Sequence, residues 1–329
     1  MASCSVCGRK AVYVLRHSGM AFCEKHFLEY FDRKVRRTIR KHSMFRPRER
    51  IVVAVSGGKD SLALLHYLVK LSRKRAPGWS ITALVIDEGI SGYREQTLRR
   101  FEKVVSELDV NYEIVRFKDE IGKTLDEIVV EARKSGLPYM PCTFCGVFRR
   151  YLINKYARKL GGSVVATGHN LDDIVQTFII NVLNNEWDKV VRLTPVSGPL
   201  SHPKFVKKVK PFYEILEKET TIYALLNGIY EGFEECPYAQ ASPRWHVRRF
   251  LNFMEERNPT LKYSLLRSLE RIVDLLKRQG VGYNGEILSC KLCGEPSAHP
   301  ICRACELRTM LGLKLRELRA DTVERKRTG

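Results

Sequence analysis

The sequence predicts a doubly wound α/β fold, built on a parallel sheet and flanked by two small cysteine-rich modules. Three observations lead to this prediction. From about residue 51 to residue 280, short β-branched runs alternate with longer helical patterns; a glycine-rich turn follows the first of these runs; and seven of the ten cysteines lie in residues 1–30 and 290–305. Alternating strands and helices form parallel sheets with right-handed crossovers and helices on both faces.

Four short runs rich in β-branched residues predict the strands of this sheet. They are IVVAV (51–55), ITALVID (81–87), YEIVRF (112–117) and SVVAT (163–167). Helical patterns predict helices between them, at residues 61–71, 93–108 and 122–133. Apolar residues at 265, 269, 272 and 276 predict one more helix, with a stripe that packs against the core. In such sheets, ligands bind at the carboxyl ends of the strands.

The charge of the chain points to a polyanionic partner. There are 57 Lys and Arg residues against 37 Asp and Glu residues, which gives a net charge of +20 and a pI near 9.6. A surplus of this size attracts nucleic acids from a distance. No run of 18 or more apolar residues is present, so we expect no contact with a membrane. The first residues do not resemble a signal peptide, and we expect a cytoplasmic protein.

A phosphate-binding loop is predicted directly after the first strand, at Ser56-Gly57-Gly58-Lys59-Asp60-Ser61. The two glycines allow a tight turn that brings backbone N–H groups to a ligand, and the following helix points its positive end at the same place. The serines add hydroxyl donors and Lys59 adds a positive charge. The loop differs from a Walker A loop, which has a glycine at the position of Val53.

A second polar block, Gly168-His169-Asn170-Leu171-Asp172-Asp173, follows the fourth predicted strand and opens another helix. Adjacent carboxylates at a helix start can be simple caps. Beside a bound phosphate group, they could instead hold Mg²⁺, which prefers one or two carboxylates together with phosphate oxygens. Both interpretations remain open for Asp172 and Asp173.

The terminal cysteines have the spacing of two structural zinc sites. One predicted site consists of Cys4, Cys7, Cys23 and His26, and the other of Cys290, Cys293, Cys302 and Cys305. Paired C-x-x-C and C-x-x-H knuckles of this kind supply four tetrahedral ligands and leave no open position. Segments this short and poor in apolar residues need metal in order to fold.

Three cysteines are left over, namely Cys142, Cys145 and Cys236. The first two begin a predicted helix. One interpretation is a thiol pair that carries a persulfide or disulfide, with Cys236 incidental. Another is an iron–sulfur cluster held by three thiolates, with one iron left free. The third is that all three are buried structural thiols.

These features divide the chain into four expected segments. They are an N-terminal zinc finger (1–30), a basic linker helix (31–50), a catalytic domain (51–280), and a C-terminal zinc finger with a basic tail (281–329). The basic stretch Arg33 to Arg50 holds nine Lys or Arg residues and one Glu. Its helix either has a solvated face or presents that face to a polyanion.

SGGKDS resembles the pyrophosphate-binding signature of the N-type ATP pyrophosphatases, or PP-loop enzymes, which cleave ATP between its α and β phosphates and adenylate a carbonyl. The resemblance implies the same doubly wound fold. It makes Lys59 a catalytic residue, with Asp172 or Asp173 as the acid/base or Mg²⁺-binding group. The residues it places at ATP are Ala54, Ser56, Gly57, Gly58, Lys59, Asp60, Ser61, Ile86, Gly168 and Asp173.

The three cysteine groups, in this order around SGGKDS and GHNLDD, resemble one branch of these enzymes, the tRNA 2-thiouridine synthetases with two terminal zinc fingers. This resemblance implies ATP-dependent adenylation of a uracil C2 oxygen in tRNA, followed by sulfur transfer. It implies that Cys142, Cys145 and Cys236 are catalytic and bind a [4Fe-4S] cluster whose free iron carries the sulfur as hydrosulfide. The implied partners are tRNA, a small thiocarboxylated ubiquitin-like sulfur carrier, and a second copy in a homodimer.

Two subfamilies of this branch differ in the uridine that they modify. CTFCGVFRR (142–150) and DEGISGYR (87–94) resemble the enzymes that act on wobble position 34. Glu235-Cys236-Pro237 and Lys210-Pro211-Phe212-Tyr213 resemble those that act on T-loop position 54. We expect position 54, with position 34 as the alternative.

The rival class is a non-catalytic, zinc-finger tRNA-binding protein. Fingers and positive charge would suffice for it, but it leaves SGGKDS and the three remaining cysteines unexplained. Amide-forming ATP pyrophosphatases, in turn, have no need of zinc fingers or of a cysteine trio. For a thiolating enzyme, we expect tRNA to lie along residues 33–50, 204–210 and 244–249, the last of which includes Trp245 as a base-stacking side chain.

Overall fold

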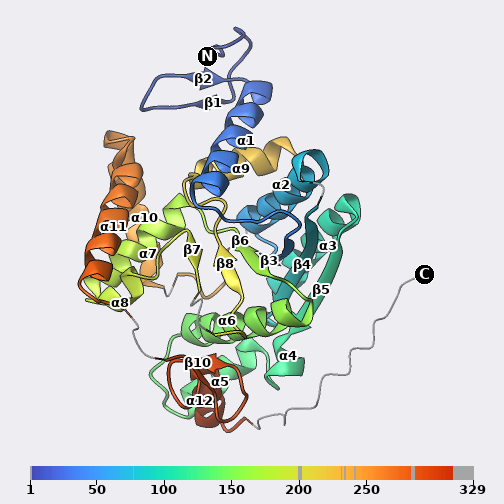
Figure 1. Cartoon of the computed structure of the whole chain (residues 1–329), viewed down its shortest axis with the longest axis vertical. Helices are drawn as coiled ribbons and strands as arrows, with labels where there is room; N and C mark the ends of the chain where they lie inside the picture. Colours follow the sequence, from blue (N-terminus) through green and yellow to red (C-terminus); the bar gives the residue numbers. More distant parts are fainter. Residues whose placement is uncertain are drawn as a thin grey trace.

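A six-stranded sheet runs through the centre of the molecule in the order β5-β4-β3-β6-β8-β7 (Figure 1). The structure is a computed structural model that describes residues 2–76, 78–198, 202–230, 232, 235–240, 242–282 and 286–313. The strands of the sheet are β3 (Arg50–Val55), β4 (Ser80–Asp87), β5 (Asn111–Arg116), β6 (Val164–Thr167), β7 (Val196–Ser197) and β8 (Lys207–Val209). All neighbouring strands are parallel except β7, which runs antiparallel to β8.

The four strands predicted from the sequence are confirmed to within one residue at each end. The sequence patterns did not identify β7 and β8, which extend the sheet at one edge. The reason is their length and composition, because β7 has two residues and β8 is Lys-Lys-Val. From β3 the chain builds β4 and β5 on one side and then crosses to β6 on the other, so β3 and β6 flank the topological switch point where α/β sheets bind ligands.

Helices cover both faces of the sheet, as expected for a doubly wound fold (Figure 1). Alternate residues of β3 point to opposite faces. Val53 belongs to a core that includes residues of α1, α2, α3 and α9, whereas Val52 belongs to a second core formed with α5, α6 and α12. The bounds of these helices are α1 (Glu24–Lys41), α2 (Lys59–Arg75), α3 (Arg94–Leu108), α5 (Leu125–Lys134), α6 (Pro141–Lys159), α9 (Glu217–Leu226) and α12 (Arg303–Met310).

A third core lies beside the sheet and joins α7 (Leu171–Leu183), α10 (Pro243–Arg257) and α11 (Leu261–Arg278). The predicted apolar stripe of α11 packs against this core, since Leu269 is buried and residues 265, 272 and 276 are partly buried against it. Leu266 and Val273, which the stripe did not include, are also buried there. The short helices α4 (Phe117–Glu120) and α8 (Trp187–Val190) complete the body. Among the described residues, no helix has both the length and the apolar character that a bilayer span requires.

The basic helix differs in extent from the 31–50 segment expected from the sequence. It is α1, which begins at Glu24, inside the first cysteine segment, and ends at Lys41. It ends there because Ser43 has a φ of 45°, a left-handed conformation that cannot continue a helix. Phe27, Phe31 and Val35 are fully buried on one face of α1, so this helix packs as well as carrying charge. The basic tail expected at 314–329 lies outside the described residues.

Each cysteine segment contains a small antiparallel hairpin, β1 (Tyr13–Val14) with β2 (Ala21–Phe22) and β9 (Leu288–Ser289) with β10 (Pro296–Ser297). One buried carboxylate, Glu219 of α9, ties the first hairpin to the body. It is 0% exposed and accepts hydrogen bonds from Lys34 Nζ (2.6 and 2.9 Å), Tyr30 Oη (2.7 Å) and Tyr13 Oη (3.2 Å). The N-terminal module is therefore anchored by a polar network as well as by apolar contacts.

We predict that Glu219→Gln lowers the free energy of unfolding by about 3–5 kcal/mol, because it leaves the Lys34 ammonium buried without its counterion. Urea unfolding followed by circular dichroism measures this change. The control is Glu131→Gln, which breaks the more exposed Lys123–Glu131 pair (2.9 Å), and we expect it to cost less than about 1 kcal/mol. Equal effects of the two substitutions would contradict the anchoring role of Glu219.

Candidate active site

The loop between β3 and α2 has the geometry of a phosphate cradle. Gly57 adopts a φ of +81°, and a Cβ there would lie 2.5 Å from the Thr97 carbonyl oxygen, so only glycine fits. Ser61 Oγ accepts a hydrogen bond from the Ser56 N–H (3.1 Å) and donates one to the Gly58 carbonyl (2.9 Å), which holds the turn closed. Helix α2 then begins at Lys59, so its positive end faces the loop. Ala54 and Ile86 lie near the carboxyl ends of the neighbouring strands β3 and β4.

Lys59 and Asp60 form a charged network with α9. Lys59 Nζ lies 2.7 Å from Asp60 Oδ2 and 2.9 Å from Glu217 Oε1. Burial alone would lower the pKa of Lys59, but the two carboxylates outweigh it and hold that pKa above its usual range. Asp60 Oδ1 accepts hydrogen bonds from Thr220 Oγ1 and from Asn170 Nδ2 (3.1 Å). Burial raises the pKa of Asp60, and the nearby Asp173 raises it further.

The second block, residues 168–173, packs directly on the phosphate loop. A Cβ at Gly168 would lie 2.9 Å from the backbone of Asp60 and Ser61, so the glycine allows this contact. Asn170 and Asp173 form a capping box at the start of α7, which confirms that the block opens a helix. Asp173 also lies 3.5 Å from Arg244 Nη1 of α10. Burial raises the pKa of Asp173, and Arg244 opposes this shift.

The structure separates the roles of the two adjacent aspartates. Asp172 is 3% exposed, and its oxygens accept hydrogen bonds from Lys262 Nζ and from the Glu217 N–H (2.7 Å). Lys262 in turn lies 2.8 Å from Glu255. Despite burial, these two carboxylates raise the pKa of Lys262. Asp172 therefore holds α7 to α9 and α11, whereas Asp173 is the aspartate of this pair that faces Asp60.

Three charged side chains connect the phosphate loop to the cysteine helix. Arg94 Nη1 donates to the Ser56 carbonyl (2.5 Å), and Arg94 Nε lies 3.1 Å from Glu88 Oε2. The other oxygen of Glu88 lies 3.2 Å from Arg149 Nε of α6. Arg149 also hydrogen-bonds Cys145, which lowers the pKa of that thiol against the effect of burial. The sequence patterns did not single out Glu88, and its position in DEGISGYR was the only signal for it.

The remaining cysteines lie together at this end of α6. Cys142 and Cys145 occupy its first turn, and Cys142 Sγ lies 3.9 Å from the Tyr238 carbonyl, two residues beyond Cys236. Burial and the Glu88 carboxylate raise the pKa of Cys145 to about 12, and burial likewise raises the pKa of Cys142 and Cys236. Arg149 and Arg244 oppose these shifts. Three thiols beside two guanidinium groups fit an anionic iron–sulfur cluster, which needs thiolate ligands and a positive surrounding.

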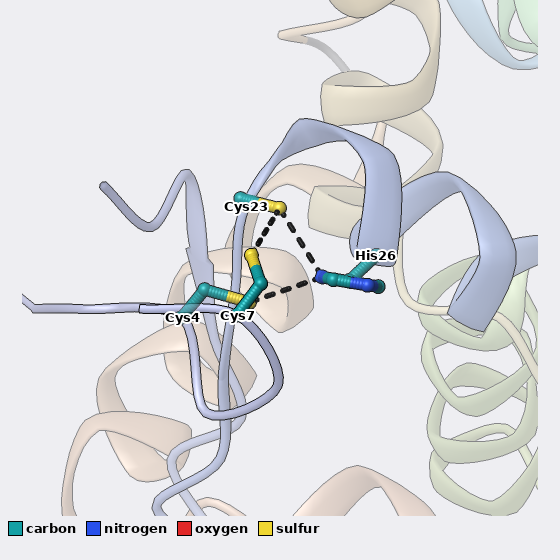
Figure 2. A group of neighbouring side chains, drawn as sticks. All are labelled: Cys4, Cys7, Cys23 and His26. Atoms are coloured by element: carbon teal, nitrogen blue, oxygen red, sulfur yellow. Dashed lines mark hydrogen bonds between the residues drawn. The ribbon is translucent and has the colours of Figure 1, made fainter. Parts of the chain in front are cut away.

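The first terminal set also fits its metal. The four ligand atoms of Cys4, Cys7, Cys23 and His26 lie within 4.8 Å of one another, and His26 presents Nδ1, 3.3 Å from two of the sulfurs (Figure 2). Although burial raises the pKa of Cys4, hydrogen bonds from the backbone of Cys23, Val6 and Cys7 lower it to about 5. A thiolate in a tetrahedral set of this size is the donor that Zn²⁺ prefers.

The second terminal set consists of Cys290, Cys293, Cys302 and Cys305, whose sulfurs also lie within 4.8 Å of one another. The Cys302 N–H donates to Cys290 Sγ (3.2 Å), and hydrogen bonds from Cys293 and Cys305 lower the pKa of Cys302 to about 4. Three of its four cysteines are buried in the core that α6 and α12 share. This set therefore also braces α6, the helix that carries Cys142 and Cys145.

We predict that the two loop glycines respond differently to alanine. Gly57→Ala should destabilise the fold by about 1–3 kcal/mol, since a methyl group there meets Thr97 at a positive φ. Gly58→Ala should leave the melting temperature unchanged, because the nearest atom, Ser56 Oγ, is 3.5 Å away. It should still abolish ATP binding, because the methyl group covers backbone N–H groups. Thermal unfolding and calorimetric titration with ATP measure the two effects, and normal ATP binding by Gly58→Ala would exclude this loop as the nucleotide site.

Comparison with known proteins agrees with this geometry. The PP-loop domain model matches residues 28–230, and the model of the N-terminal LIM domain of 2-thiouridine synthetase TtuA matches residues 3–28. A tRNA-5-methyluridine(54) 2-sulfurtransferase of Pyrococcus horikoshii is 37% identical over 303 residues, 92% of each chain. The tRNA 2-thiolation protein NcsA of Haloferax volcanii is 33% identical over 320 residues, 92% of this chain and 97% of that protein.

A solved structure is similar over nearly the whole chain. It is the U34-tRNA thiolase NcsA from Methanococcus maripaludis with its [4Fe-4S] cluster, which has a TM-score of 0.79 and 32% sequence identity and covers 94% of this chain and 96% of that one. Two family models, two sequence relatives and one solved structure thus agree on one kind of protein. The chain belongs to the PP-loop family of tRNA 2-thiolation sulfurtransferases.

Proposed function

We propose that this protein uses ATP to adenylate the C2 oxygen of a uridine in tRNA and then replaces that oxygen with sulfur. The observation that carries the proposal is the connection of the phosphate loop to the cysteine trio through Arg94, Glu88 and Arg149. A nucleotide site and a thiol site held this close suit two consecutive reactions on one atom. A tRNA-binding protein without chemistry needs neither.

In the first reaction the uracil C2 oxygen attacks the α phosphate, and pyrophosphate leaves. The N–H groups of the loop and the Lys59 ammonium would stabilise the negative charge of the departing group. Asp60 and Asp173 are the residues suited to hold Mg²⁺, since burial raises the pKa of both carboxyl groups and the Asp173 carboxylate lies near enough to raise that of Asp60 further. Asp172 is committed to Lys262 and serves as a positioning residue.

In the second reaction sulfur bonds to C2, and AMP leaves with the former uracil oxygen. A [4Fe-4S] cluster on Cys142, Cys145 and Cys236 would supply an open iron for sulfur delivery. Arg149 and Arg244 would balance the negative charge of its ligands. In the part of the chain that the structure describes, every other cysteine belongs to one of the two terminal sets, so three protein ligands are available and no fourth.

The terminal sets would bind one Zn²⁺ each and serve folding, in keeping with four ligands and no open position. The sulfur source would be a small thiocarboxylated carrier protein, and the enzyme would act as a homodimer in the cytoplasm. Support for these assignments is the resemblance of the whole chain to thiolating enzymes. Helix α10 would guide tRNA into the site, because Arg244 lies beside Asp173 and Trp245 follows it.

We assign the modified uridine to position 54 of the T loop. Glu235-Cys236-Pro237 and the run Lys210 to Tyr213 support this assignment, as does 37% identity to a tRNA-5-methyluridine(54) 2-sulfurtransferase. The competing position is 34, because the similar solved structure is that of a U34-tRNA thiolase. Both positions require the same chemistry, so the site itself does not depend on the choice.

We predict that reconstituted enzyme, given ATP and sulfide, introduces one sulfur into tRNA, and that Cys142→Ala, Cys145→Ala and Cys236→Ala each abolish it. Each variant should lose cluster absorbance and thiolation together while it retains ATP binding, because the loop is built by other residues. Mass spectrometry of nuclease fragments of the tRNA measures both the yield and the modified position. Thr143→Ala, within the same helical turn, is the matched control and should behave as wild type.

Two results would contradict this account. Full thiolation by iron-free protein would exclude the cluster mechanism and favour a thiol-pair mechanism. In that mechanism, Cys236→Ala would lower the thiolation activity only slightly. Sulfur at position 34 would retain the chemistry and overturn the assignment to the T loop.

A further inference from the structure

A basic cavity lies between the N-terminal hairpin, α1 and the start of α11. Its volume is about 470 Å³, which is within the range of pockets that hold small ligands or single nucleotides. Its walls come from elements other than those that carry the phosphate loop and the cysteine trio. The cavity is therefore a candidate binding site separate from the reaction centre.

Four arginines line this cavity, namely Arg33, Arg37, Arg40 and Arg267. The first three are spaced along one face of α1, and all four side chains are exposed. Among the described residues, none of those that line the cavity is acidic. The site therefore combines concentrated positive charge with a concave shape.

The nearby carboxylates are already occupied by other cations. Glu219 is bound by Lys34, which neutralises the floor of the cavity. Glu214 lies 2.7 Å from Lys41 and 3.4 Å from His42, and it reaches Arg37 only at 3.7 Å. Within the described part of the chain, no carboxylate pairs with Arg33, Arg40 or Arg267. Arg33 and Arg40 are thus available to bind an external anion. Arg37 has only the long contact with Glu214, and Arg267 donates one hydrogen bond to Ser264 Oγ (3.1 Å), which leaves its other N–H groups available.

Aromatic rings complete the walls. Tyr30 and Tyr263 are half-buried, and their hydroxyl groups are fixed by Glu219 and Lys34 respectively. The His17 ring lies 5.9 Å from the Tyr263 ring, edge to face, at the rim of the cavity. Tyr30 stacks on Phe22, with ring centroids 5.2 Å apart, and Lys34 Nζ lies over the Tyr30 and Tyr263 rings at 5.5 and 5.1 Å. The planes left to stack on unpaired bases are therefore the His17 ring and the arginine guanidinium groups, which can also bind phosphates.

We propose that this cavity binds an unpaired segment of the tRNA substrate, away from the uridine that is modified. The proposal rests on tRNA being the substrate, as proposed above. RNA is favoured over an acidic protein because guanidinium planes and the His17 ring can stack on bases as well as bind phosphates, and carboxylate side chains offer no surface for such stacking. The cavity would hold the body of the tRNA while a uridine is presented to the reaction centre.

The test compares Arg33→Gln/Arg37→Gln with a charge-matched control, Arg99→Gln/Lys134→Gln, on the exposed surfaces of α3 and α5. Binding of an unmodified tRNA transcript to the full-length, metal-loaded protein is measured over a series of salt concentrations. The Arg33→Gln/Arg37→Gln variant, here called the groove variant because both residues line the cavity, should bind tRNA at least about tenfold more weakly at moderate salt. Its log–log salt slope should be shallower by about 1.4, or ~0.7 for each lost contact with single-stranded phosphate. The control should differ little from wild type.

Steady-state pyrophosphate release adds a second measurement. The groove variant should show a higher KM for tRNA and an unchanged kcat, since no residue of the phosphate loop is altered. Unchanged tRNA affinity and salt slope in the groove variant would overturn the proposal. If the groove variant loses binding to poly-L-glutamate but still binds tRNA as wild type does, the proposal is wrong and the cavity binds an acidic protein instead. If wild type itself does not bind tRNA, the proposed function fails, whereas equal binding by wild type and the groove variant refutes only the cavity.

Discussion

The candidate active site depends on one buried carboxylate, Glu88, held between two arginines. It is 3% exposed, and each of its oxygens faces a different guanidinium group, one belonging to Arg94 and one to Arg149. Arg94 fixes the backbone of the phosphate loop at Ser56, and Arg149 contacts Cys145. A carboxylate in such a place is costly to bury and is stable only while both partners remain. Glu88 therefore couples the position of the phosphate loop to the position of helix α6.

Two partly buried lysines at the end of the sheet near this site have lowered pKa values. Burial and Arg150 lower the pKa of Lys208 to about 8, and burial and Lys208 do the same to Lys210. These lysines are protonated below about pH 8 and lose their protons as the pH rises. The cause is burial, which makes the charged form of each lysine unfavourable. The same argument explains why Asp60 and Asp173, whose pKa values are raised, suit a Mg²⁺ ion that restores their charge.

The sequence was most informative where chemistry requires particular residues in consecutive positions. SGGKDS identified the loop because a tight turn needs Gly57, and the paired knuckles identified both terminal sets because four ligands must surround one ion. It could not distinguish Asp172 from Asp173. The two are the same residue type at adjacent positions, and their roles differ only through the neighbours that the fold brings to each side chain. Glu88, Arg149 and Glu217 were not identified because their partners are distant in sequence and are brought near only by the sheet. Strand β8 was missed for a related reason: two lysines in a three-residue strand carry no apolar pattern.

The most direct measurement of the coupling is made on Glu88→Gln. The account predicts that this variant loses affinity for ATP by about tenfold or more in metal-free protein, and that it also binds less iron on reconstitution, because charge-assisted contacts on both sides are lost together. Glu127→Gln, which breaks the exposed Lys118–Glu127 pair, is the matched control and should change neither quantity. If Glu88→Gln binds ATP and iron as wild type does, or loses only one of them, the two halves of the site are independent and the account is wrong.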